Sequence, residues 1–148
     1  MASSAPLSLE AIRSTLATKA LGQTLYLYQD LLSTNREAGA LAQQGAPHGT
    51  LLVAERQSGG HGRHGRAWFS PPGFNIYCSL IVRGKGQAVP LAQWLSWVPL
   101  VTALAVTEAT QQVTAVPLTL KWPNDLLLHD RKVGGILCES TLTTADGP

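Results

Sequence analysis

The spacing of the apolar residues predicts a helix and then a strand near the start of the chain. Leu9, Ile12 and Leu16 recur at helical intervals, so a helix is expected from Ser8 onward. The run that follows, QTLYLYQDLL at residues 23–32, has the composition of a strand.

A second helix and a second strand are expected next. The helix lies in STNREAGALAQQG, where Thr34 and Glu37 have the spacing of a capping box and Gly45 supplies a stop. GTLLVAERQ is then a strand that leads directly into a glycine-rich loop.

The middle of the chain combines a β-type run with a long apolar helix. FNIYCSLIVR is rich in strand-forming residues, and GKGQ after it is a turn. The helix is expected from Pro99 to about Val113, with Pro99 in its first turn, where a proline has no hydrogen bond to lose.

Three short strands are expected near the end of the sequence. LTLKW and DLLLHD are joined through Pro123 and Asn124, and KVGGILCES follows them. Helices and strands thus mix without strict alternation, which favours a mixed sheet with helices packed on it over a doubly wound parallel sheet.

Length and composition are those of one folded domain. The 148 residues are 45% hydrophobic and 14% charged, which excludes a disordered chain. The net charge of +2 does not indicate a dedicated nucleic-acid binder, although basic side chains gather between Arg56 and Arg66.

The sequence favours a cytoplasmic protein. MASSAPLSLEAIR lacks the basic and apolar regions of a secretory signal, and WLSWVPLVTALAV falls short of the ~20 apolar residues that span a bilayer. Cys78 and Cys138 lie in apolar strand-like runs, where they are interpreted as small buried side chains and not as a disulfide.

A loop from Ser58 to Gly73 concentrates glycines, arginines and histidines in SGGHGRHGRAWFSPPG. Glycines let backbone N–H groups approach an anion, and Arg63 and Arg66 offer planar donors that match a carboxylate or phosphate. We interpret the loop as a site for an anion such as an acyl phosphate. A flexible linker, an RNA-binding arginine-glycine segment and a basic hairpin connection are the alternatives.

No structural metal site is expected. His61 and His64 are neighbours in the loop, but His48 and His129 lie in unrelated segments and the cysteines lie in strands. A transition metal needs three or four convergent ligands.

Two further motifs carry candidate chemistry. STN, at residues 33–35, is typical of a helix cap, and its hydroxyl groups can also bind a small polar ligand. KWPNDLLLHDRKVGGI carries Lys121, Asp125 and Lys132, and a turn between the last two can return them to one face. A hairpin with a charged turn is the alternative.

In order and spacing, STN, AERQSGGHGRHGRAWFSPPGFNIYCSL and KWPNDLLLHDRKVGGILCE together resemble the motifs of biotin–protein ligases, also called biotin–[acetyl-CoA-carboxylase] ligases. The resemblance extends from about Leu9 to Ser140. It implies an α+β fold with a mixed, largely antiparallel sheet flanked by helices, related to class II aminoacyl-tRNA synthetases and lipoate ligases and incomplete at its C-terminal end.

The resemblance implies a two-step reaction. Biotin and MgATP give biotinyl-5'-adenylate and pyrophosphate, and a lysine of the biotin carboxyl carrier domain of acetyl-CoA carboxylase or a related carboxylase then takes the biotinyl group. A lipoate or octanoyl ligase, a biotin-binding fragment without activity and an RNA-binding module are the alternatives.

The resemblance also assigns residues to biotin. Ser33, Thr34 and Gln57 should bond its ureido ring, the glycine loop should close over it, and Lys132 should reach its carboxylate. The full set implied is Ser33, Thr34, Asn35, Gln57, Gly60, His61, Gly62, Arg63, Lys132 and Gly135.

A second set is implied for the nucleotide and the chemistry. Arg66, Trp68, Lys121 and Asn124 belong to the ATP side. The catalytic residues implied are Arg63, Asp125 and Lys132, with a fixed cation opposite the charge that develops. Magnesium enters only with ATP.

The sequence departs from the family pattern at two points. His61 stands where the family usually has arginine, so a group that is about neutral near pH 7 replaces a permanent charge. Residues 1–148 are expected to form a partial catalytic domain without an N-terminal winged helix or a C-terminal β-barrel. DNA is therefore not expected as a partner. No membrane is expected as a partner either, and a homodimer is left open.

Overall fold

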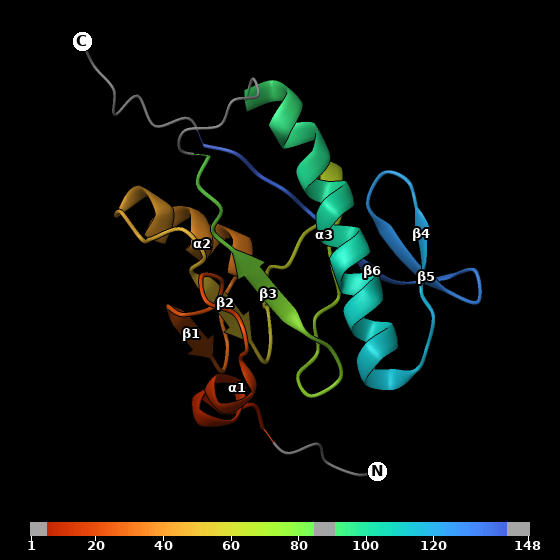
Figure 1. Cartoon of the computed structure of the whole chain (residues 1–148), viewed down its shortest axis with the longest axis horizontal. Coiled ribbons are helices and arrows are strands. Elements are labelled where there is room, and N and C mark those ends of the chain that lie inside the picture. The colour runs from red at the N-terminus through yellow and green to blue at the C-terminus, as the bar shows by residue number, and fades with distance from the viewer. Residues whose placement is uncertain (1–5, 85–90, 142–148) are drawn as a thin grey trace. The chain divides into compact units, whose positions relative to one another are not determined.

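The chain divides into two compact units, residues 1–83 with 141–148 and residues 84–140. The computed structural model describes residues 6–84 and 91–141 (Figure 1). Helices and strands follow one another without strict alternation, so the expected α+β class is confirmed. The described strands form two three-stranded sheets, where a single sheet was expected.

The first unit is built on a mixed sheet in the order β1-β2-β3. Strands β1 (Leu25–Tyr28) and β2 (Leu51–Ala54) run parallel, and β3 (Tyr77–Leu80) pairs with β2 in the antiparallel direction. All three lie inside the runs that composition predicted as strands, each run being longer than its strand.

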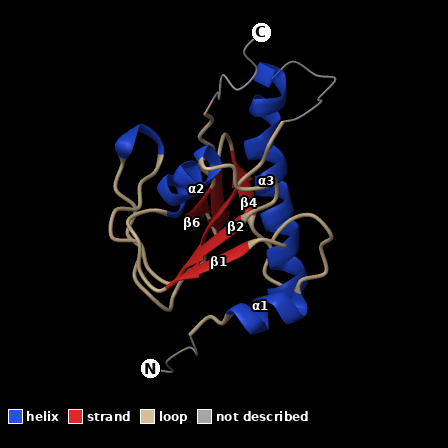
Figure 2. Cartoon of the chain, turned by 90° about the vertical axis from the view of Figure 1, so that its left-hand side faces the viewer, coloured by secondary structure: helices blue, strands red, loops and turns tan. Residues whose placement is uncertain are grey.

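Two helices accompany this sheet, α1 (Leu9–Thr15) and α2 (Thr34–Gln43). Helix α2 packs against β2 and β3 (Figures 1 and 2). Ala38 of α2, Leu52 of β2 and Ile81 form the buried apolar cluster between helix and sheet. This cluster fixes the face of α2 that is turned toward the strands.

The capping box expected at Thr34 and Glu37 is wrong. Ser33 is the N-cap and makes no capping bond with its side chain, and Thr34 is already the first helical residue. Glu37 accepts a hydrogen bond from the Tyr28 hydroxyl at 3.3 Å. Burial and then this carboxylate raise the pKa of Tyr28. The predicted stop is confirmed, because Gly45 follows the helix with a φ of +92°.

The second unit contains helix α3 (Leu91–Thr114), which begins earlier than expected. Pro99 lies inside the helix and not in its first turn. The predicted helix start was wrong for a physical reason. A proline in a helix interior removes one backbone hydrogen bond, so prolines are normally found in the first turn, and Pro99 is an exception. The described part of the chain contains no helix that combines the length and apolar character needed to cross a bilayer.

An antiparallel sheet completes this unit, with β4 (Thr119–Lys121), β5 (Asp125–Leu128) and β6 (Arg131–Gly135) in sequence order. His129 and Asp130 connect β5 to β6 with φ values of 46° and 61°, as a tight hairpin turn requires. The expected third strand, KVGGILCES, is shorter than predicted, because it ends at Gly135.

Both cysteines are free and exposed, so the expectation that they are buried is wrong. Side chains alternate along β3, so Tyr77 and Ser79 are buried while Cys78 and Leu80 lie on an exposed face. Desolvation by neighbouring atoms nevertheless raises the pKa of the Cys78 and Cys138 thiols. The turn expected in GKGQ falls outside the described residues apart from Gly84.

Candidate functional site

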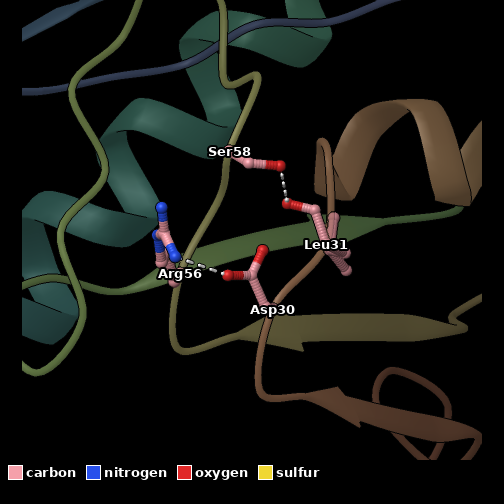
Figure 3. A network of polar contacts seen from close by, with 4 residues as sticks. All are labelled: Asp30, Leu31, Arg56 and Ser58. Carbon is pink, nitrogen blue, oxygen red and sulfur yellow. Dashed lines mark hydrogen bonds and ion pairs between the residues drawn. The ribbon is translucent and has the colours of Figure 1, made fainter.

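The site in the first unit is built where the chain continues past the ends of β1 and β2. Leu31 and Gln57 form a parallel bridge, in which the Leu31 amide donates to Arg56 O and the Ser58 amide donates to Leu31 O. Two side chains add to the pairing (Figure 3): Arg56 Nη1 lies 2.9 Å from Asp30 Oδ2, and the Ser58 hydroxyl donates to Leu31 O. These contacts bring the start of α2 opposite Gln57.

Gln57 is held in one orientation by the first helical residue. Its Oε1 accepts from the Thr34 backbone N–H at 2.8 Å and lies 3.1 Å from Thr34 Oγ1. Its Nε2 donates to Ser70 Oγ at 3.3 Å. A backbone N–H can only donate, so the amide oxygen must face Thr34. The amide of Gln57 therefore replaces the missing cap at the start of α2.

Ser79 extends this network from β3. Its Oγ lies 2.8 Å from Thr34 Oγ1 and 2.5 Å from Asn35 Oδ1. Ser33, Thr34 and Ser79 are all buried. Three of the residues expected at biotin, Thr34, Asn35 and Gln57, thus meet in one polar cluster.

Two members of the cluster, Ser70 and Ser79, were missed from the sequence. The available signal for Ser79 was its position two residues from Tyr77 and Ile81, which makes it a polar residue on the inner face of an apolar strand. For Ser70 the sequence offered only its place near the end of the glycine loop, within the quoted motif.

The glycine loop is closed on itself by backbone contacts. The Trp68 amide donates to Gly60 O at 2.9 Å, and the Gly62 amide donates to Arg66 O at 2.7 Å. Between them the chain makes a single 3-10 turn at Arg63–Gly65. The side chains of His61, Arg63 and Arg66 are exposed, as an anion-binding role requires.

Gly60 is the point at which the loop touches the polar cluster. A Cβ on Gly60 would lie 2.9 Å from both Gln57 Nε2 and Ser70 Oγ, closer than real Cβ contacts occur. Only glycine lets the loop backbone approach the Gln57 amide this closely.

A pocket of about 440 Å³ opens beside this cluster. Gln57, Ser58, Ser70 and Arg56 supply its polar wall. Its remaining lining is aromatic or proline: Trp68, Phe69, Pro71 and Pro72. A few polar groups among apolar walls are typical of sites for small ligands.

The second unit holds the remaining candidates on the β4–β5–β6 sheet. Lys132 Nζ lies 2.6 Å from Asp125 Oδ1, so the hairpin brings these two to one face, as predicted. The register passes through an irregularity between Leu126 and Leu127, which pairs Lys132 with Leu127. The side chain of Lys132 is 42% exposed and that of Asp125 is 27% exposed.

The other expected residues of this unit surround the ion pair. Lys121 pairs with Asp125 across β4 and β5, and Gly135 pairs with Asp125 across β5 and β6. Asn124 is fixed by Ile136, whose amide donates to Asn124 O while Asn124 Nδ2 donates to Ile136 O. A Cβ on Gly135 would lie 3.6 Å from Lys132 Nζ, so the ammonium group rests against this glycine.

Among the residues that the structure describes, no group of three or more histidine, cysteine, aspartate or glutamate side chains could hold a metal ion.

Comparison with known proteins identifies the family. The model of the biotin/lipoate A/B protein ligase family matches residues 28–146. The chain belongs to this family. The match covers both the polar cluster of the first unit and the charged hairpin of the second.

The similar curated proteins are biotin ligases. The bifunctional ligase/repressor BirA of Bacillus subtilis is 39% identical over 133 residues, which are 90% of this chain and 40% of that protein. The biotin--[acetyl-CoA-carboxylase] ligase of Mycobacterium tuberculosis is 41% identical over 111 residues, covering 72% of this chain and 41% of that protein. This family member therefore spans about 40% of the length of these relatives.

Solved structures agree. The biotin protein ligase from Aquifex aeolicus in complex with biotin and ATP has a TM-score of 0.67 and 36% sequence identity, and covers 80% of this chain and 47% of that one. The biotin protein ligase from Leishmania major in complex with biotin has a TM-score of 0.66 and 27% identity, with 80% and 52% covered. The α+β fold expected from the sequence is the fold of these biotin ligases.

Proposed function

We propose that the chain is part of a biotin–protein ligase and forms its ureido-binding site with the polar cluster of Thr34, Asn35 and Gln57. The observation that carries the proposal is the fixed amide of Gln57 beside an apolar-walled pocket. A ureido ring presents one carbonyl acceptor and two N–H donors, and an oriented amide can both accept from and donate to such a ring. The Aquifex aeolicus relative is described with biotin and ATP bound.

The proposed first step activates the biotin carboxylate. One of its oxygens attacks the α-phosphorus of ATP, an O–P bond forms, and pyrophosphate leaves with the electrons of the broken bond. Lys132 and Arg63 are proposed to stabilise the charge that develops on the phosphate oxygens. Asp125 holds the Lys132 ammonium group 2.6 Å away and thereby orients it.

The proposed second step transfers the biotinyl group. The amine of a carrier-domain lysine attacks the acyl carbon of the mixed anhydride, an amide forms, and AMP leaves. The partner is a biotin carboxyl carrier domain of a carboxylase, and the location is the cytoplasm. Arg66, Trp68, Lys121 and Asn124 are proposed for the nucleotide, which brings its own magnesium ion. Gly62 and His61 are proposed to complete the loop over biotin. Ser33 and Gly135 are also proposed for biotin.

Calorimetric titration with biotin, followed by biotin plus MgATP, tests this proposal. We expect one-to-one binding of biotin, and a Gln57→Ala variant should bind about tenfold more weakly or worse, because it loses an amide that bonds the ring. Gln43→Ala changes an exposed glutamine of α2 and is the matched control.

Three outcomes would contradict parts of the proposal. A parent chain that does not bind biotin excludes the ureido site. Tighter binding of lipoate than of biotin assigns the chain to the lipoate branch of the family. Biotin binding without release of pyrophosphate from MgATP leaves a biotin-binding protein that does not form the adenylate.

A further inference from the structure

The buried serine of β3 occupies a central place in the ureido-binding cluster. Ser79 pairs with Leu52 in the β2–β3 ladder, so its position is fixed by the sheet and not by the helix that it contacts. Its side chain is 7% exposed and touches two residues of α2, Thr34 and Asn35, which are more than 40 positions earlier in the chain. Ser79 is therefore the side chain through which the sheet contacts the start of α2.

The cluster contains three oxygen–oxygen contacts that need a shared proton. Thr34 Oγ1 lies 3.1 Å from Gln57 Oε1 and 2.8 Å from Ser79 Oγ, and Ser79 Oγ lies 2.5 Å from Asn35 Oδ1. Each hydroxyl group carries one proton, so Thr34 and Ser79 supply two protons for three contacts. One of the three contacts must lack its hydrogen bond.

The distances decide which contact lacks the proton. O–H···O bonds are usually 2.5–3.0 Å long, and the contacts of Ser79 with Thr34 and with Asn35 lie in that range. The contact between Thr34 and Gln57 is the longest of the three. Asn35 presents its amide oxygen Oδ1 to Ser79, and an amide oxygen can only accept, so Asn35 supplies no third proton to these contacts. The three distances are met best when Ser79 donates to Asn35 Oδ1 and the Thr34 hydroxyl donates to Ser79 Oγ, which leaves the 3.1 Å contact between Thr34 and Gln57 without a proton.

We propose that Ser79 is a positioning residue for the ureido site: it draws the Thr34 proton away from Gln57 and leaves Gln57 Oε1 able to accept an N–H of the ligand. This inference rests on the proposed function. With the proton directed to Ser79, Gln57 Oε1 keeps one bond from the Thr34 amide and one open lone pair. The site is then rich in acceptors, which matches the N–H groups of a cyclic urea.

Replacing Ser79 removes the acceptor that holds the Thr34 proton. In Ser79→Ala the Thr34 hydroxyl turns to Gln57 Oε1, the acceptor left to it within the cluster, and that oxygen is then saturated before the ligand arrives. We expect the dissociation constant for biotin, measured by calorimetry, to rise about tenfold, which corresponds to one hydrogen bond. Ser79→Thr restores the hydroxyl group and should recover most of the affinity. If Ser79→Ala does not fold, Ser79→Cys replaces the hydroxyl acceptor by a weak sulfur acceptor in a side chain of the same shape.

A double-mutant cycle separates positioning from a purely structural role. In a Thr34→Val background there is no hydroxyl proton to direct, so Ser79→Ala should produce no further loss of biotin affinity. An equal loss in both backgrounds would contradict the proposal. Thr50→Val is the matched control, because Thr50 is another fully buried hydroxyl of this unit that donates to Pro47 O; it should lower stability and leave the biotin dissociation constant unchanged.

Biotin binding by the parent chain separates a failure of the proposed function from a failure of the positioning role. A parent that does not bind biotin overturns the proposed function, and this inference with it. A parent that binds biotin, together with a Ser79→Ala variant that is folded and binds equally well, overturns the positioning role alone.

Discussion

Lys132 and Asp125 form an ion pair whose partners are both partly exposed, at 42% and 27%. Solvent screens such pairs, so the pair contributes little to folding stability. We propose that its role is to place an ammonium group where a substrate carboxylate or phosphate can replace or join the aspartate. Changes at this pair should therefore affect the reaction more than the fold.

Lys132→Ala is expected to reduce adenylate formation at least about a hundredfold while weakening biotin binding modestly, because the ammonium group interacts most strongly with charge that builds up in the transition state. Lys132→Arg should restore the rate in part, since a planar guanidinium cannot replace a compact charge. The measurement is pyrophosphate release with biotin and MgATP.

The neighbouring exposed cation on β6 provides the control for this substitution. Arg131→Ala should adenylate biotin at the parent rate and unfold at the parent temperature. An equal effect of Arg131→Ala and Lys132→Ala would reduce the role of Lys132 to general surface charge, and a Lys132→Ala variant with the parent rate would remove this residue from the mechanism.

Helix α2 is held at its far end by an arginine from the segment after β3. Arg83 Nε donates to Ala46 O and Arg83 Nη2 donates to Ala42 O, both at 2.8 Å. The last carbonyl groups of a helix have no partner within the helix, and a cation that bonds them also opposes the negative end of the helix dipole. Arg83 thus fastens the C-terminal end of the helix whose first turn belongs to the proposed ureido site.

Arg83→Ala should lower the free energy of unfolding of the first unit by about 1–2 kcal/mol, since two hydrogen bonds from a charged donor are lost. Chemical denaturation gives the measurement. Arg36→Ala, which changes an exposed arginine in the same helix, serves for comparison and should have little effect. Equal midpoints for the two variants would show that the contacts of Arg83 do not stabilise the helix.

Most helices and strands could be predicted from the sequence because their spacing and end residues are local signals. Helix α1 begins after Ser8, which accepts from the Ala11 amide as a cap should, and β5 and β6 flank the predicted turn. The start of α3 could not be predicted, because Pro99 is a strong signal for a helix start and was taken as one. The capping box failed because a tertiary partner, Gln57, replaced the local one.

The site shows the same division between local and tertiary information. Thr34, Gln57, Asp125 and Lys132 stand in motifs, and the sequence was sufficient to single them out. Ser79 lies inside one of the quoted motifs, but nothing in that motif marks it as a site residue, and its proposed role depends on a contact between β3 and α2 that exists only in the folded chain.

At the scale of the whole molecule, buried apolar side chains are distributed unequally. Most of those described belong to the first unit: Leu25, Ala38, Leu52, Val53, Ala54, Tyr77 and Ile81. Among the described residues of the second unit, Ala103 and Leu126 are the buried apolar ones. Burial of apolar surface is the main source of folding stability, so the two sheets should differ in resistance to local unfolding.

Hydrogen exchange followed by mass spectrometry should show this difference. The amides of β2, which is paired on both sides, should exchange at least about tenfold more slowly than those of β5, the equally central strand of the other sheet, because opening β2 exposes more apolar surface. Equal protection of β2 and β5 would mean that the chain unfolds as one cooperative body.

The bridge between Leu31 and Gln57 also sets a rule for changes in chain length. Side chains alternate along extended segments, so inserting or deleting one residue between Tyr28 and Leu31 moves a different residue into line with Gln57. An insertion or deletion at that position is therefore equivalent to replacing the proposed binding residues, although no side chain has been mutated. The connection at residues 44–49, between α2 and β2, lies outside this pairing, so a change of length there leaves the partner of Gln57 unchanged, although it disturbs the contact of Ala46 with Arg83.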